Sequence, residues 1–314
     1  MVNPNDWLTQ QWPGFAGLGQ RQARLLAESR HDMLSAGMNG RIAMIGRATA
    51  FAAVSALLAA LATPAAADRL DDVKARGKLI VGVSDTTPPF SFKKPGDTNV
   101  IGYDIDIVNA VGKRLGLGVE TLSLSSAERI PLIQQGKIDF AATSMTRTPA
   151  RLKDIDFSLI YFVTPHAVIV KKSSGITSVH QLAGKKASSA STSTAGDNLK
   201  EAEPKVELVY VRDYSIAFAM LKDGQVDAFP TDESVLRAIV QQDGHPGDYL
   251  FLTDFTKSRN VGFAMKKDEP RFKEAINKAL LDVETSGDAT KIFEAWFGPK
   301  SQEPMARKFK IQAD

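Results

Sequence analysis

Hydroxyl groups and a guanidinium follow directly after the short apolar run 138–142. Ser144 and Thr146 supply the hydroxyls, and Arg151 supplies the guanidinium. Hydroxyls, free backbone N–H groups and an arginine at the carboxyl end of a strand are the groups that bind a carboxylate. The alternative interpretation is a surface loop in which Arg151 pairs with a nearby aspartate.

The chain repeats this construction. Leu132-Ile-Gln-Gln-Gly-Lys-Ile-Asp139 parallels Met220-Leu-Lys-Asp-Gly-Gln-Val-Asp227. Each copy reads as the end of an amphipathic helix, a glycine suited to the left-handed helix cap and a short strand. Five residues after the aspartate comes Ser144 in one copy and Asp232 in the other. Donors plus Arg151 on one side and a carboxylate on the other would hold an α-amino acid; alternatively, Asp232 only caps the next helix.

Two more stretches could line a pocket. Ser84 follows the apolar strand 79–83, and Phe90 comes after a pair of prolines. We expect Phe90 to line the site in part, with burial in the core as the alternative. Arg129 stands in the first turn of a predicted helix, where the helix dipole disfavours a cation. This position suggests that Arg129 reaches a ligand or an acid.

A hydroxyl-rich run, 188–194, opens another predicted helix and contains Thr192 and Ser193. The backbone N–H groups at such a helix entry can seat an anion. The same run could equally be a solvated turn in which a threonine caps the helix.

No pattern of catalysis or metal binding is present in the sequence. The closely spaced Asp104 and Asp106 could suggest metal binding or acid–base chemistry, but capping explains an acid at a helix start. The chain has no Cys, and its four His residues show no metal-ligand spacing. We expect no catalytic residue, no metal and no cofactor.

The elements that must position these residues alternate along the chain. Strands are expected at 79–83, 119–124, 138–142, 167–170 and 206–211, with helices between them, and further strands at 249–252 and 261–265. This alternation predicts an α/β fold with parallel strands. The segment 161–165 is the expected crossing between two similar halves.

Composition narrows the class of protein. With 43% hydrophobic and 24% charged residues, the chain is an ordinary globular protein of one large or two ordinary domains. Its formal net charge is +3 and no long basic run occurs, so we expect no nucleic-acid partner.

The N-terminal region has the pattern of an export signal. Arg41 and Arg47 precede an apolar stretch, 48–61, and a small-residue site at 63–67. This predicts a secretory signal peptide that starts at Met38 and is cleaved after Ala67, which leaves 1–37 as an upstream extension. The alternative is a membrane anchor, for which the apolar stretch is short.

Several ordered motifs carry a resemblance to a known family. Together they resemble family 3 of the bacterial extracellular solute-binding proteins, which are the polar amino-acid receptors of ABC importers. The resemblance covers about residues 78–298. The motifs are Val100-Ile-Gly-Tyr-Asp-Ile-Asp106, Arg129-Ile-Pro-Leu-Ile-Gln-Gln-Gly136, Ser144-Met-Thr-Arg-Thr-Pro-Ala-Arg151, Asp156-Phe-Ser158 and Glu294-Ala-Trp-Phe-Gly298.

The resemblance implies a two-lobe, type II periplasmic-binding-protein fold. Each lobe would be a central sheet flanked by helices, and two crossing strands would form the hinge. Lobe 1 would comprise 78–163 and 259–298, lobe 2 would comprise 164–258, and 299–314 would be a polar tail. By this likeness Arg151 binds the ligand's α-carboxylate and Asp232 its ammonium. The other implied contacts are Thr146, Thr192 and Ser193, with a backbone contact from Ser144.

The implied function is that of a monomeric periplasmic receptor, which delivers an amino acid to an inner-membrane permease and its cytoplasmic ATPase. The Arg129-Ile-Pro131 segment, 285–287 and the tail look most like glutamate/aspartate receptors. Ser84 stands where the receptors of acidic ligands can carry an arginine. For glutamate to be the ligand, Arg129 or Arg147 would have to take the place of that arginine. Asp85, one residue further on, leaves glutamine and asparagine as alternative ligands. The alternatives are a cyclohexadienyl dehydratase acting on prephenate or arogenate, and a soluble partner of a chemoreceptor.

Overall fold

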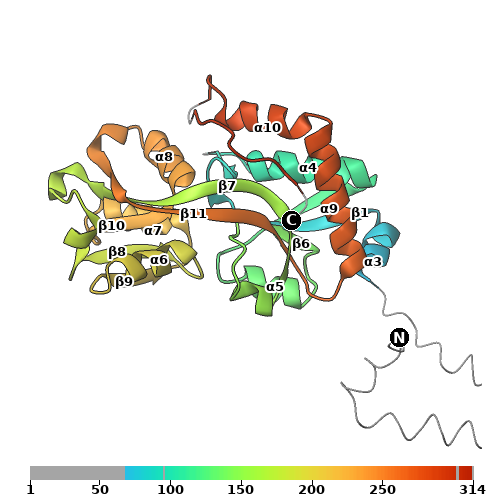
Figure 1. Cartoon of the computed structure of the whole chain (residues 1–314), viewed down its shortest axis with the longest axis horizontal. Coiled ribbons are helices and arrows are strands. Elements are labelled where there is room, and N and C mark those ends of the chain that lie inside the picture. Colours follow the sequence, from blue (N-terminus) through green and yellow to red (C-terminus); the bar gives the residue numbers. More distant parts are fainter. Residues whose placement is uncertain (1–67, 95, 302–303, 313–314) are drawn as a thin grey trace, which may run out of the picture. The chain divides into compact units, whose positions relative to one another are not determined.

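Two long antiparallel strands run through the centre of the sheet in the computed structural model, which describes residues 68–94, 96–301 and 304–312. These strands are β7 (Asp156–Lys171) and β11 (Tyr249–Met265). The full sheet has eight strands in the order β5-β1-β6-β11-β7-β10-β8-β9 (Figure 1). The expected start at Met38 and the cleavage after Ala67 lie outside the described residues.

One end of this sheet belongs to lobe 1. Strand β6 pairs with β11 only at residues 264 and 265, and β1 pairs in parallel with β5 and β6. A separate three-stranded sheet, β2-β3-β4, lies in the same part of the chain. The elements of lobe 1 are α3 (Arg69–Arg76), β1 (Lys78–Val83), β2 (Thr86–Thr87), β3 (Ser91–Lys93), β4 (Val100–Ile101), α4 (Tyr103–Leu115), β5 (Gly118–Ser123), α5 (Arg129–Gln134), β6 (Phe140–Ala142), η1 (Arg151–Lys153), α9 (Pro270–Thr285) and α10 (Asp288–Phe297).

The other end belongs to lobe 2. Strand β10 pairs with β7 over residues 166–170, and β8 pairs in parallel with β9 and β10. The elements of lobe 2 are η2 (Lys172–Ser174), η3 (Val179–Leu182), β8 (Lys186–Ala190), α6 (Thr194–Ala202), β9 (Glu207–Val211), α7 (Tyr214–Lys222), β10 (Ala228–Asp232), α8 (Glu233–Gln242) and η4 (Pro246–Asp248).

The crossing is longer than its sequence pattern suggested. The expected crossing at 161–165 lies inside β7, and the two strands expected at 249–252 and 261–265 are the ends of one strand, β11. The polar residues between those ends stay extended because Lys257 to Val261 pair with β7, with a register irregularity between Leu252 and Lys257. Both crossing strands therefore link the lobes.

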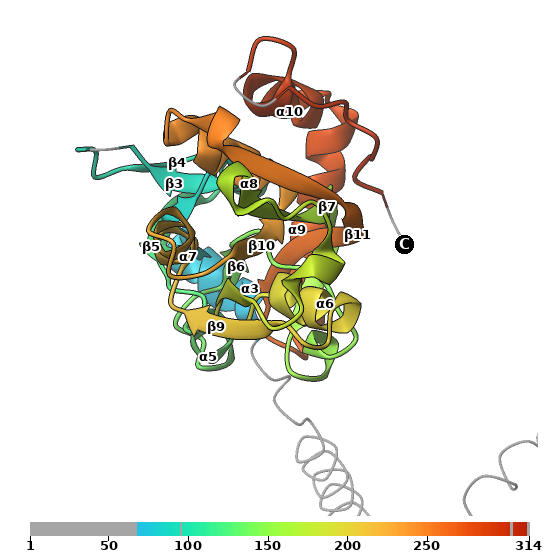
Figure 2. The same cartoon turned by 90° about the vertical axis from the view of Figure 1, so that its left-hand side faces the viewer.

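Helices cover both faces of the lobe 2 sheet, which explains its apolar strands. Alternate residues of β10 enter different clusters: Phe229 packs with the buried side of α7, whereas Ala228 packs with Leu199 of α6. In Figure 2, α6 and α7 lie on opposite sides of this sheet. The side-chain period of two in a strand produces this division.

The repeated motif performs the same structural task in each lobe. Asp139 donates its N–H to the carbonyl of Ile80 and accepts the N–H of Ile80 on its carboxylate, at 2.8 and 2.6 Å. Asp227 makes the same two bonds with Lys186, at 2.8 and 3.0 Å. Each aspartate thereby fixes the helix–strand unit to the first strand of its lobe.

The residues after α10 pack back onto lobe 1. Phe309 lies 5.1 Å from Phe162 of β7, between ring centroids, and Ile311 is buried. Arg307 forms an ion pair with Glu284 of α9, which also accepts the N–H of Ile311. The described part of the tail is therefore attached to the crossing strand and to α9.

Candidate functional site

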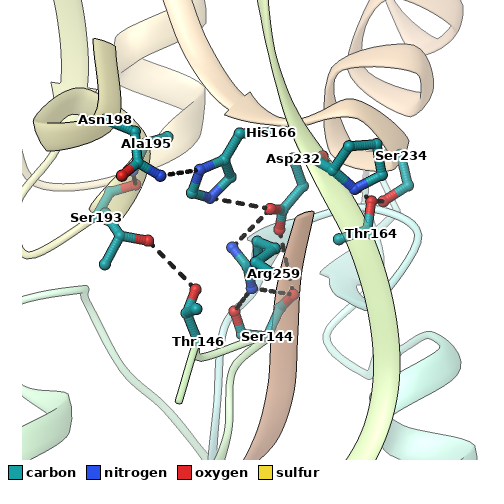
Figure 3. A network of polar contacts seen from close by, with 12 residues as sticks. Ser144, Thr146, Thr164, His166, Ser193, Ala195, Asn198, Asp232, Ser234 and Arg259 are labelled. Atoms are coloured by element: carbon teal, nitrogen blue, oxygen red, sulfur yellow. Dashed lines mark hydrogen bonds and ion pairs between the residues drawn. The ribbon is translucent and has the colours of Figure 1, made fainter. Parts of the chain in front are cut away.

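A network of polar side chains lies where the two lobes meet the crossing strands (Figure 3). Asp232, at the end of β10, is fully buried, and its carboxylate lies 2.6 Å from Nη1 of Arg259 on β11. Ser144 of lobe 1 donates its hydroxyl to the same carboxylate at 3.3 Å, and its carbonyl accepts from Nη2 of Arg259. The predicted acid thus already has a cationic partner within the chain.

His166 of β7 lies on the other side of Asp232. Its Nδ1 accepts from the amide of Asn198 at 2.8 Å, so its proton lies on Nε2, which faces Asp232 Oδ1 at 3.6 Å. Burial, together with the charges of Arg259 and Arg151, lowers the pKa of His166 to about 3. His166 is therefore neutral and contributes a dipole to the network, not a charge.

Asp104 does not cap α4, contrary to the expectation from sequence. The residue before α4 is Gly102, which has a φ of 140° and at which a Cβ would lie 2.0 Å from the carbonyl oxygen of Phe90, so no side chain fits there. Asp104 is instead fully buried and accepts from the hydroxyl of Tyr161 at 2.8 Å and the N–H of Ser144 at 3.1 Å. Burial raises its pKa to about 7, against these hydrogen bonds. The Ser144 N–H is consequently not free for a ligand.

Arg151 reaches across from lobe 1 to lobe 2. Its Nη1 donates to the carbonyl of Thr146 at 2.7 Å and its Nη2 to the carbonyl of Thr192 at 2.6 Å. Burial, together with the charges of Arg259 and Arg129, lowers the pKa of Arg151 to about 10. A guanidinium has five N–H donors, and these two bonds use two of them within the described part of the chain.

The N-terminus of α6 lies beside Thr146. Ser193 is the N-cap of this helix and accepts the N–H of Ala195 at 3.3 Å, while Thr194 Oγ1 lies 3.3 Å from Thr146 Oγ1. Thr192 has a positive φ of 63° and donates its hydroxyl to the carbonyl of Ser126 in lobe 1 at 3.0 Å. Thr192 therefore lies next to Arg151 and Ser193 follows it at the N-cap of α6, and both hydroxyls make contacts within the protein.

Arg129 and Ser84 lie at a neighbouring cavity of about 300 Å³, which is lined by residues of both lobes. Arg129 is buried, its Nε has no hydrogen-bond partner in the described part of the chain, and burial lowers its pKa, against the effect of Tyr214. The cavity wall also contains the charged residues Asp85, Glu128, Arg212 and Asp213. Its size and polar lining suit a small polar molecule.

Phe90 belongs to the core and not to the site. Its ring centroid is 4.8 Å from that of Phe162 and 5.8 Å from that of Phe297, and the side chain has no exposed surface. The preceding prolines turn the chain so that the ring enters lobe 1, where edge-to-face aromatic contacts hold it.

Sequence reasoning missed Arg259 and His166. Arg259 stands in the polar stretch that the strand prediction left out, and only its pairing with Thr164 of β7 shows that it lies on a crossing strand. The sequence does contain a signal for Arg259. It lies two residues before the apolar run 261–265, and the chain at that point has to cross back from lobe 2 to lobe 1.

Two kinds of feature were not found among the described residues. Within the described ranges, no group of three His, Cys, Asp or Glu side chains could hold a metal ion. No helix in the same ranges combines the length and the apolar character that crossing a membrane requires.

Comparison with known proteins agrees with this architecture. Residues 79–299 match the model of the bacterial extracellular solute-binding proteins, family 3. The glutamine-binding protein GlnH of Bacillus subtilis is 33% identical, over 73% of this chain and 84% of that protein. The glutamate/aspartate import solute-binding protein of Escherichia coli is 32% identical, over 75% of this chain and 82% of that protein.

A solved structure shares the fold. An ancestral arginine-binding protein bound to glutamine is 37% identical and has a TM-score of 0.67, covering 71% of this chain and 99% of that one. The shared elements are those of the two-lobe, type II periplasmic fold. With the family model spanning both lobes and the crossing strands, this chain belongs to family 3 of the bacterial extracellular solute-binding proteins.

Proposed function

We propose that this protein is the periplasmic receptor of an ABC importer for polar amino acids, and that its ligand is glutamate or aspartate. The ligand binds between the lobes, and the closed complex delivers it to a membrane permease driven by a cytoplasmic ATPase. Binding involves no chemical step. The cross-lobe contacts of Arg151 and Thr192 support closure of this kind.

One observation carries the choice of ligand. Arg129 is buried and Arg151 is half-buried, and neither forms a close ion pair with an Asp or Glu among the described residues, although Asp104 and Asp197 lie near enough to affect their pKa values. Each is close enough to the other for their charges to interact. An enclosed guanidinium without a counter-ion is costly, and a bound carboxylate relieves that cost. Two such groups fit the two carboxylates of an acidic amino acid.

In this arrangement Arg151 binds the α-carboxylate with its N–H donors, beside the N-terminus of α6. Arg129 binds the side-chain carboxylate in the adjoining cavity, next to Ser84. The ligand's ammonium approaches Asp232, whose carboxylate it shares with Arg259.

Glutamine is a second candidate. Ser84, Ser125 and Ser126 line the cavity beside Arg129, and hydroxyls of this kind can bond a side-chain amide. The B. subtilis relative is a glutamine-binding protein. The two candidates differ by one ligand charge, which makes a direct comparison decisive.

The test is calorimetry with glutamate, aspartate, glutamine, asparagine and arginine, after a thermal-shift screen against the common amino acids. A tight ligand raises the apparent stability by mass action. We expect an acidic amino acid to bind best and Arg151→Ala to lose at least about 100-fold in affinity, since it removes a bidentate partner. Arg271→Ala, at an exposed arginine that pairs with Asp71, is the control. A screen without any binder, or an Arg151→Ala affinity near that of the native protein, would refute the proposal.

An eliminating enzyme on this scaffold would need a proton donor in contact with its substrate. Asp104 has a suitable pKa of about 7, but its carboxylate is bonded by Tyr161 and Ser144, and it is not among the residues that line the cavity beside Arg129. We therefore favour binding alone. Formation of phenylpyruvate from prephenate by the purified protein would contradict this choice.

A further inference from the structure

Arg259 joins three parts of the molecule. It comes from the crossing strand β11, its Nη1 lies 2.6 Å from the carboxylate of Asp232 in lobe 2, and its Nη2 bonds the carbonyl of Ser144 in lobe 1. The side chains of Arg259 and Asp232 are only 5% and 1% exposed. Arg259 is thus a cationic partner of Asp232 within the protein itself. Without Arg259, the ammonium of a bound amino acid would be the cationic partner of Asp232.

Three arginines lie close together around the cleft. Arg129, Arg151 and Arg259 interact electrostatically with one another. Asp232 forms its ion pair with Arg259, and His166 is neutral. Asp104 and Asp197 act on Arg129 and Arg151 without a close ion pair. Since Arg259 and Asp232 form a pair, Asp232 is not the counter-ion of Arg129 or Arg151.

We propose that Arg259 is a specificity-determining residue, which acts as the built-in counter-ion of Asp232 and thereby makes the cleft select for negative charge on the ligand's side chain. This inference rests on the proposed function, because it assumes an amino-acid ligand between the lobes. Without Arg259, Asp232 would offset one of the other guanidinium groups. The cleft would then suit a neutral side chain better.

The quantity to measure is the ratio of the dissociation constants for glutamine and glutamate. Both ligands carry the same α-carboxylate and ammonium, so any change in ammonium binding cancels in this ratio. The ratio therefore reports only how the affinity depends on the charge of the ligand's side chain. Variants that merely disturb the fold weaken both ligands together and leave the ratio in place.

The experiment is calorimetric titration of both ligands into the native protein, Arg259→Gln, Arg259→Lys, Asp232→Asn and the double variant. Arg259→Gln should shift the ratio by about tenfold or more toward glutamine, because one nearby positive charge is lost. Asp232→Asn should shift it toward glutamate. The double variant and Arg259→Lys should lie near the native ratio.

The outcomes separate the two proposals. If the native protein binds no amino acid, the proposed function fails. If it binds them but Arg259→Gln and Asp232→Asn leave the ratio unchanged, or shift it in the same direction, the role of Arg259 fails alone. Should Arg259→Gln not fold, Asp232→Asn still tests the role, because it leaves Arg259 unpaired and must shift the ratio toward glutamate; should Asp232→Asn not fold, the shift of Arg259→Gln toward glutamine tests it.

Discussion

Two buried titratable groups beside the cleft have pKa values that move in opposite directions. Burial raises the pKa of Asp104 to about 7 and lowers that of His166 to about 3. The contribution of Asp104 to stability is therefore greatest at acid pH and declines as the pH rises toward 7. The contribution of His166 is present above its unfolded value of 6.5 and is lost as the pH falls toward 3.

A variant isolates the histidine. His166→Gln keeps a donor and an acceptor but cannot titrate, whereas Asp104 is the same in both proteins. Between pH 7.5 and 5.0 the native protein should lose about 2 kcal/mol more free energy of unfolding than the variant. Urea unfolding at both pH values measures the difference. Parallel pH profiles of the two proteins would show that His166 titrates normally when folded.

At the scale of elements, the two copies of the repeated motif differ in how deeply their aspartates are enclosed. The Asp139 side chain has no exposed surface and pairs with Arg69, at 2.6 Å, and with Arg76, both of α3. The Asp227 side chain is 34% exposed, and its ion pair with Lys185 measures 3.7 Å. The two aspartates therefore hold the backbone in the same geometry, but the Asp139 side chain is buried and the Asp227 side chain is partly exposed to water.

Substitution of the matched pair should reveal this difference. Asp139→Ala leaves two partly enclosed arginines and the N–H of Ile80 without their partner, and should lower the free energy of unfolding by about 3 kcal/mol or more. Asp227→Ala should cost only about 1 kcal/mol, since water can replace the carboxylate. Chemical denaturation of both variants provides the comparison, and equal losses would contradict this account.

At the scale of the whole molecule, the described tail ties the C-terminal end of the chain to the crossing strand. Phe309 packs on Phe162 of β7 and on Phe293 of α10, and Arg307 pairs with Glu284 of α9. None of the predicted ligand-binding residues lies in the tail. Its contacts therefore concern the stability of lobe 1 and not the recognition of the ligand.

Removal of residues 304–314 should lower the free energy of unfolding by about 3 kcal/mol or more, because it exposes aromatic core surface and breaks an enclosed ion pair. Ligand affinity should remain close to native. Lys308→Ala, at an exposed position of the tail, should change stability by less than about 0.5 kcal/mol. Thermal unfolding and titration of both proteins are the measurements. A truncated protein as stable as the full chain would show that the tail contacts contribute nothing.

Local patterns in the sequence determined most of the helices and strands and the structural similarity of the two lobes. The glycine and aspartate of each repeat have the same backbone roles in the structure because caps and short strands depend on a few neighbouring residues. The matched positions of Ser144, just after β6, and Asp232, at the end of β10, follow from the same repeat.

Only the tertiary structure decided which charges meet. Phe90 enters the core, Asp104 bonds the Ser144 N–H instead of capping its helix, and Arg259 reaches Asp232 across 27 positions of sequence. Such partners depend on how two lobes and a pair of crossing strands are assembled. No local pattern records this assembly, because the energy of an enclosed charge is set by neighbours that are distant in the chain.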